Sequence, residues 1–273
     1  MKQGSGRKLA LRIVSIFVIA VAGGARPEAS LAQGVFEAPR HSEHDQPNFE
    51  GIWQALDPAP HYNLEPHSGR FGVPPGTGAI IDPPDGKIPY TAAALAKREQ
   101  NVANRATADP YAKCFKPGVP HIMYAPHPFQ IIQSGNFLTI SSEYVHNTRF
   151  VFLNRDGHFG EGELDLWNGD SVGRFEGNAL VTDVFNLHPD MWLDRAGNHG
   201  GSPPLRVNER FTLIDADTIQ YDATLTNPEM YTRPWTLRVY LYRHKDPDKR
   251  ILEYECHAYA DNALRPPVLP VVP

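Results

Sequence analysis

From Gln130 onward, the sequence consists of short segments in which apolar and polar residues alternate, separated by turn residues. This period of two places successive side chains on opposite faces of a β-strand. Strands are predicted within 130–144, 147–157, 171–187, 205–226, 235–243 and 250–258, with turns at 134–136, 176–178 and 215–217. Eight or nine strands joined in sequence leave exposed edges unless the sheet closes. We therefore expect an all-β fold, an antiparallel up-and-down barrel of the lipocalin or calycin type with about eight strands. A two-sheet sandwich is the alternative.

The alternation also predicts which side chains face the inside of this sheet. Three successive segments each place four residues on one mainly apolar face: Val207, Glu209, Phe211 and Leu213; Ile219, Tyr221, Ala223 and Leu225; Trp235, Leu237, Val239 and Leu241. A barrel of about eight strands has an interior that can hold one small ligand. We expect Tyr221 and Trp235 to contact such a ligand.

Two further regions precede the predicted barrel domain, 129–273. Residues 33–128 are rich in Pro, Gly and His and predict a coil-rich arm packed on the barrel. Within it we expect one short strand in "NFEGIWQ" (Asn48 to Gln54) and one short helix in 91–110 that Thr91 caps. Residues 1–32 predict a signal peptide, because a basic start precedes about ten apolar residues at 13–22, too few to span a bilayer. Cleavage is expected after "SLA", before Gln33, with "AVA" and "GGA" as earlier alternatives, and an uncleaved anchor is the competing interpretation.

These features predict a periplasmic or secreted protein without stable membrane insertion after cleavage. The formal net charge is −5, and no basic run follows the first dozen residues, so a nucleic-acid partner is not expected. The chain has two cysteines, Cys114 and Cys256. In an oxidising compartment we expect them to form a disulfide, and two buried thiols are the alternative.

Glu209 is the first candidate catalytic residue. A carboxylate on an apolar face is costly unless it is paired, and an unpaired one acquires a raised pKa that suits general acid–base catalysis. The competing interpretation is a structural ion pair with Arg149, Arg174 or Arg210.

The stretch "MWLDRAGNHGG" contains the second candidate pair, Asp194 and His199. Five residues apart in a glycine-rich loop, they can meet in a hydrogen bond that orients the imidazole as a base near neutral pH. Trp192 can form an aromatic wall beside them. Alternatively, Asp194 makes a turn and His199 is merely exposed.

Two more clusters lie at predicted strand ends. In "EYVHNTRF", Tyr144, His146 and Arg149 can bind a carboxylate or phenolate, or they form an ordinary polar turn. In "NPEMYTRPWT", the side chains of Tyr231, Arg233 and Trp235 alternate ahead of a strand and suit an aromatic acid, or the segment is a rim loop. Trp167 can be another wall of the pocket or part of the core.

No cofactor and no metal is expected. The chain contains no P-loop, dinucleotide-binding fingerprint or Gly-x-Ser-x-Gly motif. Its many histidines fall mostly in the coil-rich arm and form no tight ligand pattern.

The region from Cys114 to Cys256, about half of the chain, resembles a large family of exported bacterial proteins. The resemblance rests on "KCFKPGVPHIM", "PHPFQII", "SVGRFEGNALVTD", "WLDRAGN", "LRVNERFTLIDADTIQYDATLTNPEMYTRPWT" and "LEYEC". Some members are similar to the decarboxylases or deformylating lyases that sphingomonads use on lignin-derived phenylcoumaran dimers. This sequence departs from the family pattern at Phe175 and Asn178, where Trp and Asp are expected, and at "NHGGSPPLRV", where a His-Ser pair is expected.

The resemblance implies a cofactor-independent carbon–carbon lyase. Phenol deprotonation expels the ring oxygen and gives a quinone methide, which accepts electrons as CO2 or formaldehyde leaves and a stilbene forms. The enzyme supplies a base, a proton donor and a dry aromatic pocket. A lipocalin-like carrier of a small aromatic or apolar ligand is the main alternative, and a structural envelope protein is the third. The expected partner is a small aromatic substrate, with a homo-oligomer as an open possibility.

Overall fold

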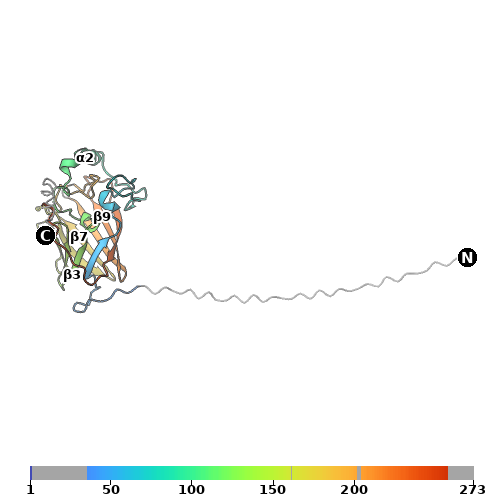
Figure 1. Ribbon diagram of the computed structural model, residues 1–273, viewed down its shortest axis with the longest axis vertical. Coiled ribbons are helices and arrows are strands. Elements are labelled where there is room, and N and C mark those ends of the chain that lie inside the picture. Colours follow the sequence, from blue (N-terminus) through green and yellow to red (C-terminus); the bar gives the residue numbers. More distant parts are fainter. Residues whose placement is uncertain (2–35, 161, 202–203, 258–273) are drawn as a thin grey trace, which may run out of the picture. The chain divides into compact units, whose positions relative to one another are not determined.

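Nine strands close into a barrel in the computed structural model, which describes residues 1, 36–160, 162–201 and 204–257 (Figure 1). Around the barrel the order is β1-β3-β4-β5-β6-β7-β8-β9-β10, and β10 pairs back to β1. A tenth strand, β2, pairs with the first residues of β10. The strands are β1 (Gly51–Ala55), β2 (Ile80–Asp82), β3 (Phe129–Gln133), β4 (Phe137–Ser142), β5 (Asn147–Phe152), β6 (Asp170–Glu176), β7 (Ala179–Phe185), β8 (Arg206–Asp215), β9 (Thr218–Thr226) and β10 (Trp235–Arg243).

One neighbouring pair of strands is parallel, which differs from a simple up-and-down barrel. Nine alternating strands cannot close with every neighbour antiparallel, because the first and last would then run in the same direction. The parallel pair is β5–β6, and residues 153–169 connect these two strands. A connection of this length is what a parallel pairing requires, since the chain must return to the starting end of the sheet. The predicted all-β barrel is otherwise confirmed.

The short strand predicted in the coil-rich arm forms as β1 and becomes part of the barrel, which the sequence placed in 129–273 alone. β1 fills the position between β3 and β10, and its Trp53 is fully buried. The prediction of a strand at 250–258 is wrong for residues 250–257, which the structure describes. In this segment Tyr254 alone makes a β-bridge, an isolated one with Tyr144. The reason is that β1 already occupies the edge of β10 beside which a further strand would have paired.

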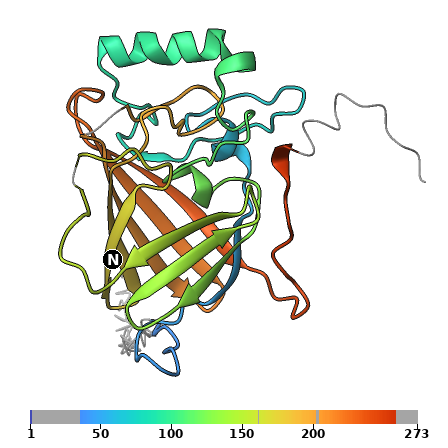
Figure 2. The same cartoon turned by 90° about the vertical axis from the view of Figure 1, so that its left-hand side faces the viewer.

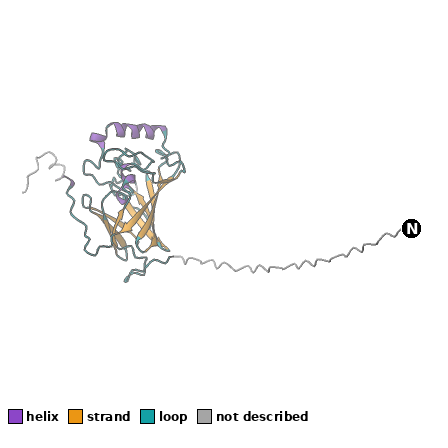
Figure 3. Ribbon diagram, turned by 45° about the vertical axis from the view of Figure 1, so that its right-hand side comes forward, coloured by secondary structure: helices purple, strands orange, loops and turns teal. Residues whose placement is uncertain are grey.

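The described helices gather at one end of the barrel (Figure 3). α2 lies across this end (Figure 2), and Thr91 Oγ1 caps it by accepting a hydrogen bond from the backbone N–H of Ala94 at 3.4 Å, as predicted. The helices are α1 (Ala59–Tyr62), α2 (Ala92–Ala103), α3 (Arg105–Ala108) and the 3₁₀ turn η1 (His121–Met123).

Side chains fill the barrel interior. The three apolar faces predicted on β8, β9 and β10 are all buried, and Trp53, Phe129, Phe211, Tyr221 and Trp235 are among the largest fully buried side chains. Cys114 and Cys256 form the expected disulfide. The predicted signal peptide lies outside the described residues apart from Met1. Within the described ranges, no helix is long and apolar enough to cross a membrane.

Candidate functional site

A cleft of about 480 Å³ lies at the end of the barrel that α2 covers. Its volume falls within the range typical of small-molecule sites, roughly 300–1,000 Å³. One face of α2, the segment around Cys114, and the loops after β5 and β7 form its walls. The lining residues are Lys97, Asn101, Ala108, Pro110, Lys113, Phe115, Trp167, His188, Pro189, Asp190, Trp192 and His199.

Three rings form a continuous stack along one wall of the cleft. The Trp167 indole stacks on His188, with ring centroids 4.3 Å apart and planes 4° from parallel. Phe115 stacks on the same indole at 5.2 Å. Offset and stacked rings at these separations are favourable, and the wall offers a flat π-surface to a planar ligand.

The charges that line the cleft favour an anionic ligand. Lys97 comes from α2 and Lys113 from the segment before Cys114, whereas Asp190 is the only carboxylate among the lining residues of the cleft. Asn101 is held in place, because its Nδ2 donates to Gly197 O at 3.1 Å. An aromatic wall beside two ammonium groups suits an aromatic acid.

His199 contributes an imidazole whose tautomer is set by its surroundings. Its Nε2 lies 3.1 Å from Ala94 O, and a carbonyl oxygen only accepts, so Nε2 carries the proton in the neutral ring. Nδ1 is then the acceptor. Burial lowers the pKa of His199, and the hydrogen bond to Ala94 O opposes this only in part. The imidazole is therefore neutral at pH 7 and able to take up a proton.

Two tyrosines fix the backbone on which His199 is carried. Tyr90 OH accepts from the N–H of His199 at 2.8 Å, and Tyr231 OH donates to its carbonyl at 3.0 Å. The Tyr90 ring also stacks on the imidazole, with centroids 5.4 Å apart. Tyr231 thus holds the backbone of a cleft residue and does not itself line the cleft. The sequence had predicted that Tyr231 contacts the ligand directly.

The predicted hydrogen bond between Asp194 and His199 is not formed among the described residues. The Asp194 carboxylate instead accepts from the backbone N–H groups of Leu64, Ala196 and Asn198, and from Asn198 Nδ2 at 2.6 Å. Complete burial raises the pKa of Asp194 to about 6, although these four donors favour the carboxylate. Asp194 is therefore a structural residue of this loop.

The doubled glycine after His199 reflects close packing. Gly201 has a φ of +74°, and a Cβ there would lie 2.6 Å from Met230 Cγ. A Cβ on Gly200 would lie 2.4 Å from Leu205 Cδ2. The loop can pass this close to Leu205 and Met230 only because positions 200 and 201 carry no side chain.

Glu209 forms a buried ion pair inside the barrel. Arg149 Nη1 donates to Glu209 Oε1 at 3.0 Å, and Nη2 bonds to Oε2. Tyr221 OH and Thr182 Oγ1 donate to the same carboxylate at 2.7 and 2.6 Å, and Arg149 Nε donates to Ser171 Oγ. Both charged side chains are at most 2% exposed. This geometry agrees with the structural interpretation of Glu209 and places Tyr221 in the same network.

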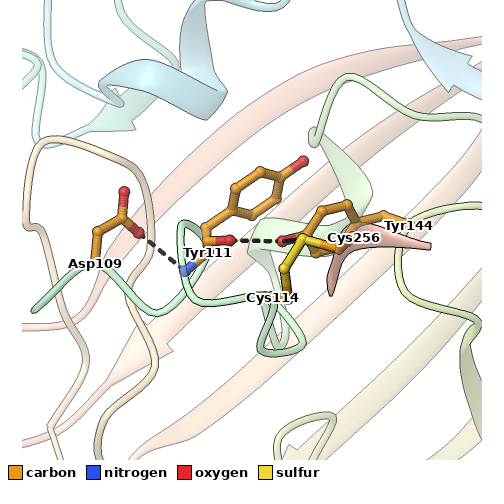
Figure 4. Close-up of a disulfide and its surroundings, with 5 residues drawn as sticks. All are labelled: Asp109, Tyr111, Cys114, Tyr144 and Cys256. Atoms are coloured by element: carbon orange, nitrogen blue, oxygen red, sulfur yellow. Dashed lines mark hydrogen bonds between the residues drawn. A yellow bond between two sulfur atoms is a disulfide. The ribbon is translucent and has the colours of Figure 1, made fainter. Parts of the chain in front are cut away.

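Tyr144 and His146 do not converge with Arg149. Tyr144 is fully buried, stacks on Tyr111 with centroids 4.1 Å apart, and donates to Tyr111 O at 2.7 Å (Figure 4). Burial raises the pKa of Tyr144 well above its ordinary value, so the hydroxyl keeps its proton at neutral pH. His146 lies at the surface, where its Nε2 is 2.7 Å from Glu255 Oε1.

The disulfide lies beside this tyrosine pair and connects the cleft wall to the C-terminal segment (Figure 4). Cys114 is flanked by Lys113 and Phe115, both of which line the cleft. Asp109 Oδ1 accepts from Tyr111 N at 2.9 Å and shapes the turn that leads into the segment. The covalent link therefore anchors the segment that carries two cleft-lining side chains.

The third predicted cluster also separates in space. Arg233 forms a surface ion pair with Asp82, and Trp235 is fully buried in the barrel. Arg233 lies in the bend that precedes β10, outside the sheet, so the regular alternation of a strand does not bring it to the face that Trp235 occupies. Of the predicted site residues, the structure brings Trp167, Trp192 and His199 together at the cleft.

Sequence reasoning missed Lys97, Lys113, Phe115, His188 and Asp190. The last four occur in irregular segments, where no periodicity predicts which way a side chain points. Lys97 lies on α2, but the sequence does not show that this face of the helix borders a cleft. It also missed a buried imidazole pair behind Trp192, in which His61 Nδ1 and His121 Nε2 are 2.9 Å apart and His121 Nδ1 is 2.9 Å from Trp192 O. Among the described residues, no cluster of three or more histidine, cysteine or acidic side chains is arranged to hold a metal ion.

Comparison with models of known protein families finds no match for this chain, and comparison with curated proteins finds no significantly similar sequence.

Proposed function

We propose that the cleft binds a small aromatic carboxylate and that the protein acts on it as a cofactor-independent carbon–carbon lyase. The observation that carries the proposal is the ring stack of Phe115, Trp167 and His188 beside the two lysines of the cleft. The resemblance to lyases of lignin-derived phenylcoumarans narrows the substrate class to an aromatic dimer and the reaction to loss of CO2 or formaldehyde.

In this proposal, the lysines bind the charged group and the ring stack binds an aryl ring. Lys97 and Lys113 come from separate segments, so their ammonium groups can hold one carboxylate or phenolate between them. Trp192, 6% exposed, limits the depth to which the ring enters.

His199 serves as the base. Its neutral imidazole takes the phenol proton at Nδ1, and the phenolate electrons expel the ring oxygen to form the quinone methide. A lysine ammonium protonates the departing phenolate and regains its proton from the solvent. When the carbon–carbon bond to the carboxylate breaks, its electron pair restores the first phenolate, which recovers the proton from His199. The products are a stilbene and CO2, and no electrons enter or leave overall.

The carrier hypothesis remains the second candidate, because of the Arg149–Glu209 pair. In the sequence, Glu209 was the ionisable residue that favoured an enzyme over a carrier. In the structure, its charge is balanced by Arg149 inside the barrel. An aromatic-anion carrier needs the ring stack and the lysines, but it does not need His199 as a base.

The test is incubation of the protein with phenylcoumaran and diarylpropane acids and alcohols, without added cofactor, while CO2, formaldehyde and stilbene absorbance are followed. The proposal expects turnover that falls at least about tenfold in Lys113→Gln and in His199→Gln. Lys249→Gln, at a half-exposed position that does not line the cleft, is the matched control. Tight binding without product, lost in Lys113→Gln and kept in His199→Gln, would instead identify a carrier.

The localisation belongs to the same proposal. A disulfide that closes 142 residues of sequence is typical of a protein that matures in an oxidising compartment, and it supports export to the periplasm or beyond. Fractionation of cells that express the full chain tests this: recovery of the disulfide-bonded form only in the cytoplasm would contradict it.

A further inference from the structure

Most arginines in the described ranges have a close partner, and three do not. Arg70 and Arg105 take part in no ion pair or side-chain hydrogen bond among the described residues, in contrast to pairs such as Arg238–Asp222. Arg98 has only a 3.9 Å contact with Glu65, whose Oε1 already accepts from the N–H of Ile88 at 3.1 Å. The Nε of Arg98 is buried and has no hydrogen-bond partner.

These three arginines line the same hollow, which has a volume of about 590 Å³. Arg98 and Arg105 come from α2 and α3, and Arg70 comes from the turn that follows α1. No aspartate or glutamate is among the lining residues, while the hydroxyl-bearing Tyr62 and Ser68 are. The hollow therefore collects three guanidinium groups, and only that of Arg98 has a carboxylate within 4 Å, the long contact with Glu65.

The arrangement is partly preorganised. Arg70 is held by two backbone hydrogen bonds with Val73, of 3.0 and 2.8 Å, which close a tight turn. Arg98 and Arg105 are fixed at their backbones by adjoining helices. Like charges held together repel each other, and a buried donor without a partner costs free energy. A bound oxyanion would relieve both costs, because guanidinium groups match phosphate and carboxylate oxygens in planar, bidentate geometry.

We propose that this hollow is a binding site for a phosphate-type oxyanion carrying at least two negative charges. It is distinct from the cleft, since α2 contributes Lys97 and Asn101 to the cleft and Arg98 and Val102 to the hollow. The anion can be a free phosphate compound or the headgroup of an anionic lipid. Phe71, fully exposed at the tip of the same turn, is the residue that would distinguish the two sources, because it can enter a lipid surface.

Calorimetric titration with pyrophosphate at low ionic strength tests the site directly. Wild-type protein should bind it, and binding should weaken as salt is raised. The triple variant Arg70→Gln, Arg98→Gln, Arg105→Gln should bind at least about tenfold more weakly, since three charge-assisted contacts are lost. The matched control removes three positive charges elsewhere, by Lys245→Gln, Lys249→Gln and Arg250→Gln, and should bind within about twofold of wild type.

Co-sedimentation with phosphatidylcholine vesicles, with and without phosphatidylglycerol, identifies the source. Binding that requires phosphatidylglycerol, the three arginines and Phe71 (tested as Phe71→Ser) supports a lipid headgroup. Pyrophosphate binding that Phe71→Ser leaves unchanged, without vesicle binding, supports a soluble anion. The double variant Arg70→Gln, Arg105→Gln leaves Arg98 in place and keeps the test valid if the triple variant unfolds. Absence of both kinds of binding in wild type, or an equal loss in the control, overturns the proposal.

Discussion

Replacement of Arg149 by methionine should strongly destabilise the barrel. The change keeps an unbranched, apolar side chain of similar length but removes the guanidinium that pairs with Glu209. The carboxylate keeps its hydrogen bonds from Thr182 and Tyr221, of 2.6 and 2.7 Å, and stays inside the barrel without a counter-charge. Breaking a buried ion pair by removing one partner costs about 3–5 kcal/mol.

Urea unfolding of the disulfide-bonded protein, followed by tryptophan fluorescence, measures this cost, because Trp53 and Trp235 are fully buried in the native barrel. For a domain of this size, the melting temperature should fall by about 6–20 °C. The companion variants are Glu209→Gln and the double variant Arg149→Met/Glu209→Gln. The double variant should be more stable than Arg149→Met alone, because a neutral amide needs no counter-charge and still accepts from Tyr221 or Thr182.

A double-mutant cycle on these proteins should therefore give a coupling energy of at least about 2 kcal/mol. A cost below about 1 kcal/mol for Arg149→Met, with an unchanged m-value, would refute the reasoning. So would strictly additive single changes, because independent effects mean that the two charges do not stabilise each other.

Three further predictions concern other parts of the fold. Burial lowers the pKa of His121 from 6.5 to about 3. As pH falls below about 6.5, the imidazole therefore takes up its proton in the unfolded chain before it does so in the folded protein. The free energy of unfolding should fall for this reason by up to about 4–5 kcal/mol. His121→Gln should flatten the pH dependence of urea unfolding between pH 6.5 and 4, and an unchanged slope would contradict this. Gly201→Ala should cost about 1–3 kcal/mol in the same assay, because an L-residue is strained at φ +74° and its Cβ meets Met230; a neutral effect would show that the loop is free to move. Replacing Cys114 and Cys256 by serine should lower the free energy of unfolding by about 5 kcal/mol in the chain-entropy model, since the link spans 142 residues, whereas thermal melts that match wild type would argue against this contribution.

Local chemistry accounts for the parts of the structure that the sequence predicts well. The alternation on β8 to β10 identifies every buried residue of those strands that faces the core, because a period of two leaves no other face for the apolar set. Thr91 marks the start of α2 by the same kind of local argument. The sequence also indicates that Glu209 points inward, although it offers Arg149, Arg174 and Arg210 equally as partners.

The choice among these partners needs the barrel to close. Arg149 on β5 and Glu209 on β8 are 60 residues apart, and their side chains meet only because both strands face the same interior. Arg174 and Arg210 instead pair with Glu176 on the outer surface. The number of strands and the parallel β5–β6 pairing likewise depend on β1 joining the barrel. The sequence predicts a short strand at this place but does not predict which strands it pairs with.

The sequence by itself determined an all-β chain, its inward faces, the capped helix and two cysteines suited to pairing, because each depends on neighbouring residues or on composition. Tertiary structure alone decided which side chains line the cleft. Lys97, Phe115, Trp167 and His199 line one cleft, although the chain between them forms strands and loops elsewhere in the fold. Irregular segments have no period that predicts side-chain direction, so their residues converge only once the barrel gives them a common end on which to pack.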